Sequence, residues 1–111
     1  MTIDISGAAP YVRLTAAGEI DSSSAPVLRQ HLETVLDTEV TEITVDLSGV
    51  TFLDSAGLCV LAAAYRRAAE QDTHLRVLAS SRAVIRPLQI TGLFDLLQVE
   101  RVDADAARVV A

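Results

Sequence analysis

Asp54, Ser55 and Gly57 stand together where a strand pattern gives way to a helix pattern. Apolar and polar residues alternate over 43–48, which predicts a strand, and the apolar residues after Ser55 recur at helical spacing. A hydroxyl at a helix N-cap lies among unpaired backbone N–H groups and at the positive end of the helix dipole. We therefore expect Ser55 to cap this helix, and a phosphate added there to find a ready anion site.

Phosphorylation is the chemistry that this segment suggests. A phosphate on Ser55 would add roughly −1.5 to −2 charge beside Asp54, which makes a docking surface repulsive without unfolding the domain. The alternative is that Ser55 only caps the helix, a role worth about 1 kcal/mol. Gly57 costs about 1 kcal/mol against Ala inside a helix, so it indicates either the close approach of a partner or tight packing of the turn against a sheet.

Strand and helix patterns predict the elements that position this segment. Alternation predicts two strands before residue 17, joined by a turn over 7–10, and helical spacing predicts a helix over 22–37. Ser23 or Ser24 is expected to cap that helix, with Pro26 in its first turn. After the central helix come a strand over 74–79, a helix from Ser81 to Gly92 that Pro87 kinks or shortens, a strand over 97–102, and either a short helix or a frayed tail over 103–111.

The order of these elements predicts an α/β fold with a mainly parallel sheet joined by right-handed crossovers. Three of the strands alternate cleanly, which indicates that one face of the sheet is partly open. If all the helices lie on the other face, each new strand adds beside the last one and a right-handed β-α superhelix results, with one extra N-terminal strand. Such a sheet lacks the reversal of strand order where open α/β sheets usually bind ligands, which argues against a cofactor-dependent enzyme.

Composition narrows the class of protein further. The 111 residues suffice for one core, and we expect residues 1–111 to form a single domain. Nine basic and fifteen acidic residues give a net charge of −6, which argues against direct binding of nucleic acid. The longest apolar run, 58–65, is far shorter than the roughly twenty residues that span a bilayer, and no secretory signal is evident. The single cysteine, Cys59, is expected in the core and fits a reducing compartment, so we expect a cytoplasmic protein.

Motifs for catalysis are missing. Ser55 lacks the glycine two positions before it that the nucleophile elbow of serine hydrolases uses, so a hydrolase with His31 or His74 is only a remote alternative. Neither phosphate-binding glycine motif occurs, and metal ligands at helical or turn spacing are absent from the sequence. We therefore predict that the chain is not an enzyme and needs no cofactor.

Three segments resemble the STAS-domain family of anti-sigma factor antagonists. FLDSAGL at Phe52–Leu58 resembles the family's phosphorylation segment, and GEID at Gly18–Asp21 and TGLFDLLQVE at Thr91–Glu100 match two further family segments in the same order. The resemblance implies that a partner anti-sigma factor with serine kinase activity phosphorylates Ser55. It also implies that the unphosphorylated form binds that kinase and frees the sigma factor, and that a PP2C-type phosphatase resets the cycle.

The resemblance also implies a partner-docking surface, made of Asp21, Ser22, Asp54, Ser55, Ala56 and Gly57. Ala56 occupies a position where many relatives carry a second hydroxyl residue, which leaves Ser55 as the acceptor. Asp21 has an alternative role as a capping residue before the serines that follow it. A different STAS role remains open, as a docking subunit of a lipid-transport ATPase or of a sensory scaffold.

Overall fold

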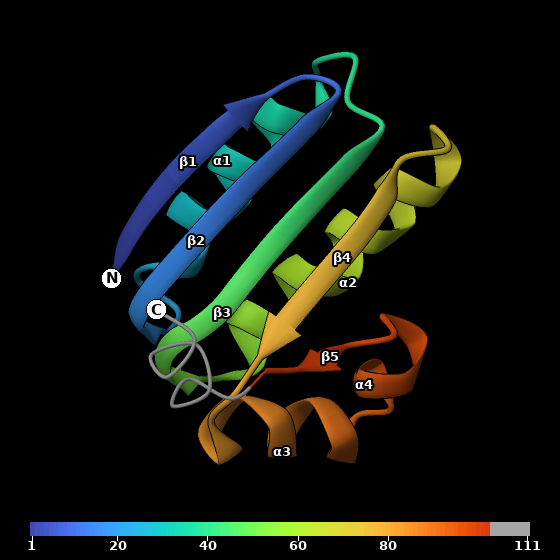
Figure 1. The fold of residues 1–111 in the computed structure, drawn as a ribbon. Coiled ribbons are helices and arrows are strands. Elements are labelled where there is room, and N and C mark those ends of the chain that lie inside the picture. The colour runs from blue at the N-terminus through green and yellow to red at the C-terminus, as the bar shows by residue number, and fades with distance from the viewer. Residues whose placement is uncertain (103–111) are drawn as a thin grey trace.

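A computed structural model describes residues 1–102 of the chain, and the tail predicted over 103–111 lies outside the described residues. The chain forms one mixed sheet, and helices connect each parallel strand to the next along the chain (Figure 1). In chain order the elements are β1 (Thr2–Ala8), β2 (Tyr11–Ile20), α1 (Ala25–Leu36), β3 (Glu42–Leu53), α2 (Ser55–Glu70), β4 (His74–Ala79), α3 (Arg82–Ile90), α4 (Leu93–Leu96) and β5 (Glu100–Arg101).

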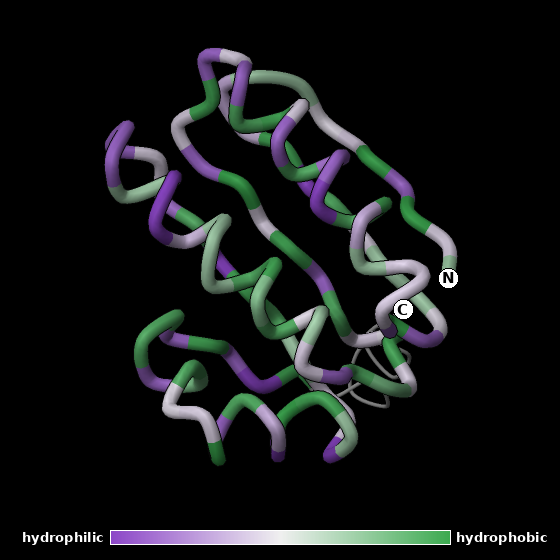
Figure 2. Tube along the Cα trace, turned by 180° about the vertical axis from the view of Figure 1, so that it is seen from behind, coloured by the Kyte–Doolittle hydropathy of each residue, from purple (hydrophilic) through white to green (hydrophobic). Residues whose placement is uncertain are grey.

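The strands lie in the sheet in the order in which they occur in the chain. β1 pairs with β2 as an antiparallel hairpin, and β2 through β5 are parallel to one another. Figure 2, seen from behind, shows that α1 and α2 lie together across one face of the sheet. The prediction of an α/β sheet that grows strand by strand without a reversal is therefore confirmed.

Alternation within the strands separates a core face from an open face. Leu14, Val45 and Val77 lie side by side in register on the core face, and each is completely buried. On the open face the neighbouring row contains Arg13, Thr44 and Arg76. Its charges are paired, because Arg13 bonds to Asp46 and Arg76 bonds to Glu100. The face that the sequence predicted to be open therefore carries ion pairs, where the other face is covered by helices (Figure 2).

Three details differ from the predictions. The last strand was expected over 97–102, but only Glu100–Arg101 pairs with β4, because α4 precedes it and Leu97 is buried in the core. Of the two predicted effects of Pro87, shortening of the helix at that residue is wrong, because α3 continues to Ile90; the kink stays a prediction. Cys59 is exposed rather than buried, because α2 packs on the core through Gly57, Val60, Leu61, Ala64 and Ala68.

Candidate functional site

Two carboxylates meet at the carboxyl ends of β2 and β3. Ile20 and Leu53 are the last paired residues of these neighbouring parallel strands, and Asp21 and Asp54 follow them directly. The backbone N–H of Asp54 donates to the carbonyl of Ile20 at 3.1 Å, which ties the two segments together. The structure thus brings the predicted residues Asp21 and Asp54 to one edge of the sheet.

Asp54, and not Ser55, caps α2. Its Oδ1 accepts the backbone N–H of Ala56 at 2.9 Å and that of Gly57 at 3.3 Å. Asp54 still has extended backbone angles, which is the usual conformation of an N-cap, and Ser55 is the first helical residue. The prediction that Ser55 caps the helix is therefore wrong by one residue.

The hydroxyl of Ser55 is free and accessible. Ser55 is exposed, and within residues 1–102 its side chain makes no hydrogen bond to another residue. The N–H groups that an added phosphate was expected to use already bond to Asp54. A phosphate on Ser55 would therefore stay on the surface beside that carboxylate.

Asp21 organises the turn before α1. Its Oδ1 accepts the hydroxyl of Ser23 at 2.6 Å and the backbone N–H groups of Ser23 and Ser24 at 3.0 and 3.1 Å. The Ser23 hydroxyl, followed by the N–H groups of Ser24 and Ser23, holds the pKa of Asp21 below its ordinary value. Asp21 is therefore a fixed negative charge that holds the turn before α1, and Ser22 is exposed beside it. The N-cap of α1 is Ser24, one of the two predicted caps, but its side chain makes no capping hydrogen bond.

Gly57 lets α2 approach the ends of β2 and β3. A Cβ atom added there would lie 2.4 Å from Cδ1 of Leu53 and 2.8 Å from Cγ2 of Ile20, and both neighbours are buried. Gly57 itself is buried beneath the predicted docking surface. Of the two explanations for Gly57, the structure supports tight packing of the turn.

Phe52 is a residue near the site that the sequence analysis did not single out. It lies two positions before Asp54, pairs with Glu19 across β2 and β3, and is 47% exposed. A large apolar residue near the end of a strand, two positions before a capping aspartate, was the available signal. Its exposure adds an apolar side chain to an otherwise acidic edge.

The two histidines do not complete a hydrolase site. His74 begins β4 and pairs in register with Glu42, the first residue of β3, whereas Ser55 follows the last residue of that strand. His31 lies within α1, and its Nδ1 is 2.8 Å from the carbonyl oxygen of Val27 on the same helix. Among residues 1–102 no cluster of three metal-ligating side chains occurs, and none of the described helices is long and apolar enough to span a membrane.

Comparisons with known proteins agree with this fold. The family described as "Mlab, STAS domain" matches residues 1–98. The anti-sigma-B factor antagonist of Listeria monocytogenes is 30% identical over 95 residues, which cover 86% of this chain and 83% of that protein. The crystal structure of an anti-sigma factor antagonist from Mycobacterium paratuberculosis is 31% identical, covers 98% of this chain and 92% of that one, and superposes with a TM-score of 0.83.

A more distant structure shares the fold alone. The Bacillus cell fate determinant SpoIIAA, in its phosphorylated form, is 18% identical, with 96% of each chain covered and a TM-score of 0.72. The relatives that match most of this chain are regulators and not enzymes, in agreement with the predicted lack of catalytic activity. On the family match and on the identity over most of its length, this chain belongs to the STAS-domain family of anti-sigma factor antagonists.

Proposed function

We propose that this chain is a cytoplasmic antagonist that binds an anti-sigma factor with serine kinase activity and thereby releases a sigma factor. Phosphorylation of Ser55 ends the binding, and a PP2C-type phosphatase restores it. The observation that carries the proposal is the exposed hydroxyl of Ser55, which makes no hydrogen bond to another described residue and lies beside the capping carboxylate of Asp54. Antagonism of an anti-sigma factor is the role named for its relatives.

The docking face in this proposal contains Asp21, Ser22, Asp54, Ser55 and Ala56, with Gly57 beneath it. All of these follow the carboxyl ends of β2 and β3. Gly57 contributes indirectly, because it allows the first turn of α2 to pack on the strand ends and so fixes where Ser55 lies.

The switch works through charge. In the transfer, an Oγ–P bond forms on Ser55, the bond between the β and γ phosphates of ATP breaks, ADP leaves, and a base of the kinase takes the hydroxyl proton. Asp21 and Asp54 supply two negative charges at this edge, and the phosphate adds roughly 1.5 to 2 more. Like charges brought together at an interface cost several kcal/mol, so phosphorylation should weaken binding by about 100-fold or more.

The test combines phosphate mapping with binding. The purified chain is incubated with ATP and, in turn, with each candidate anti-sigma kinase of its own genome, and mass spectrometry locates any phosphate. Calorimetry then measures the affinity of Ser55→Asp and Ser55→Ala for that kinase. Ser6→Asp, on the exposed strand β1, is the matched control.

We expect phosphate on Ser55, weakened binding for Ser55→Asp, and near-normal binding for Ser55→Ala and Ser6→Asp. Unchanged affinity of Ser55→Asp would contradict the charge switch. A stable complex without phosphate on Ser55 would instead favour the alternative role, a docking subunit of a lipid-transport ATPase or a sensory scaffold.

A further inference from the structure

We infer that the groove between α1 and α2, which extends along α2 from Ala56 to Arg66, is a second contact for the same anti-sigma kinase and receives an apolar side chain flanked by carboxylates. This inference rests on the proposed function, which it extends from the phosphorylated edge to the neighbouring helix pair. The groove has a volume of about 420 Å³. Ala25, Pro26 and Arg29 of α1 line one side, and Ala56, Val60 and Arg66 of α2 line the other.

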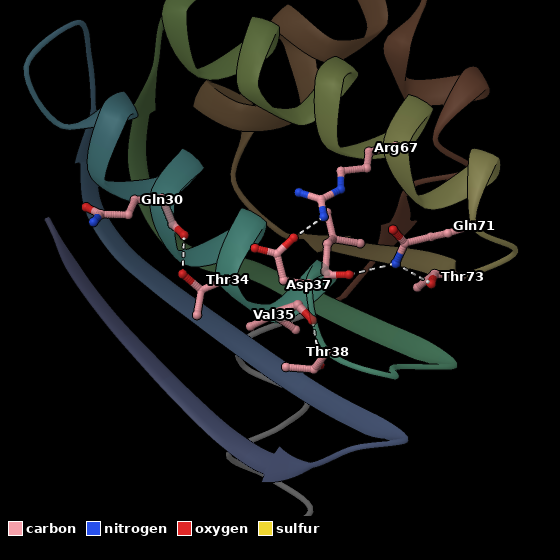
Figure 3. A network of polar contacts seen from close by, with 9 residues as sticks. Gln30, Thr34, Val35, Asp37, Thr38, Arg67, Gln71 and Thr73 are labelled. Atoms are coloured by element: carbon pink, nitrogen blue, oxygen red, sulfur yellow. Dashed lines mark hydrogen bonds and ion pairs between the residues drawn. The ribbon is translucent and has the colours of Figure 1, made fainter.

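Polar contacts join α1 and α2 at the end of the helix pair that is farther from the docking face. Figure 3 shows these contacts, in which Arg67 of α2 pairs with Asp37 and Nε2 of Gln71 donates to the carbonyl of Leu36 at 2.9 Å. A separate cavity of about 50 Å³, whose lining includes Leu36 and Arg67, lies between the helices toward that end. Near the docking face, by contrast, the small side chains of Ala25 and Ala56 line the larger groove.

Charge identifies what the groove would bind. Arg29 and Arg66 line it, and within residues 1–102 neither has a carboxylate within 4.0 Å. Arg13, Arg67 and Arg76, by contrast, each form an ion pair inside the molecule. Two guanidinium groups without such partners, beside an apolar floor in a chain of net charge −6, fit an acidic segment with an apolar anchor.

Position ties the groove to the docking face. Ser22 and Ala56 belong to the docking face and also line the groove, so one partner surface can cover both. The docking face is electronegative and the groove is electropositive. A partner whose acidic segment lies on the groove can bind in only one register, because the carboxylates of the docking face repel that segment, which gives the groove a role in choosing among similar kinases.

Cys59 offers a direct test because it is the single cysteine of the chain, is exposed and lines the groove. The rate at which DTNB modifies Cys59 is measured with and without the anti-sigma kinase that binds the chain. At saturating kinase we expect the rate to fall at least about tenfold. Calorimetry should show that Arg29→Glu and Arg66→Glu each raise the Kd about tenfold, a change of about 1.4 kcal/mol, with a weaker dependence on salt.

Arg86→Glu is the matched control, because Arg86 is exposed on α3 and forms no ion pair within the described residues. It should leave the Kd within twofold, and circular dichroism should show all three variants folded. If none of the kinases binds the chain, this result refutes both the proposed function and the groove inference. If a kinase binds and phosphorylates Ser55 while Cys59 stays reactive and both groove variants bind normally, only the groove inference falls. Protection of Cys59 by self-association without kinase would also overturn it.

Discussion

Replacing Asp54 and Ser55 one at a time separates the stability of α2 from the signal that it carries. Asp54→Ala removes the acceptor of two backbone N–H groups, one of them on the buried Gly57. Loss of an N-cap costs about 1 kcal/mol, and loss of a negative charge at the helix N-terminus costs about 0.3 to 1 kcal/mol more. We therefore expect Asp54→Ala to lower the free energy of unfolding by about 1.5 to 2 kcal/mol.

Ser55→Ala should behave differently because the Ser55 side chain is exposed and bonds to no other described residue. Exposed substitutions usually change stability by less than about 0.5 kcal/mol, and Ala is the better helix former. Asp54→Asn is the matched control, since Asn caps helices about as well as Asp but carries no charge. It should recover most of the stability that Asp54→Ala loses.

Urea unfolding followed by circular dichroism measures these differences. With a slope of about 2 kcal/mol per M, the Asp54→Ala midpoint should fall by about 1 M, while that of Ser55→Ala stays within about 0.3 M of the original. The result that refutes the assignment is a Ser55→Ala midpoint as low as that of Asp54→Ala, because Ser55 would then stabilise the helix.

Two further predictions concern packing and pH. Gly57→Ala should destabilise the fold by about 1 to 2 kcal/mol in urea unfolding, because the new methyl overlaps Leu53 and Ile20; an equally stable variant would contradict the packing. For Asp46, burial raises the pKa, but Ser48 and Arg13 lower it below its ordinary value. Its stabilisation is therefore full above the unfolded pKa near 4 and is lost as the pH falls through the folded pKa. In Asp46→Asn the free energy of unfolding should therefore fall less steeply as the pH is lowered through this range. An unchanged pH dependence would exclude a stabilising role for the Asp46 carboxylate.

Much of the fold followed from local patterns in the sequence. Alternation identified strands whose core faces carry residues such as Leu14 and Val45. The consecutive strand order followed from right-handed crossovers with the helices on one face of the sheet. Cys59 was misplaced because α2 is apolar on several sides, so periodicity alone does not show which side meets the sheet. The last strand was predicted too long because Leu97 and Val99 are buried outside any strand.

The site shows the same division between pattern and geometry. The sequence identified Asp54 and Ser55 as the start of a helix, but the choice of cap depends on which residue keeps extended backbone angles, and helix ends vary by a residue in any pattern. Arg29 and Arg66 lie 37 residues apart in the sequence, and only the packing of α1 on α2 places both on one groove. No local signal marks them, because exposed arginines are common on helices.

The position of the cap explains how a phosphate could switch binding without altering the fold. Had Ser55 been the cap, a phosphate would have competed for the N–H groups of Ala56 and Gly57, and the helix start would have taken part in the switch. Asp54 already holds those groups, and Gly57 packs the first turn against Leu53 and Ile20. We therefore expect the first turn of α2 to keep its structure when Ser55 is phosphorylated, and the two forms to differ in the charge that they present to the partner.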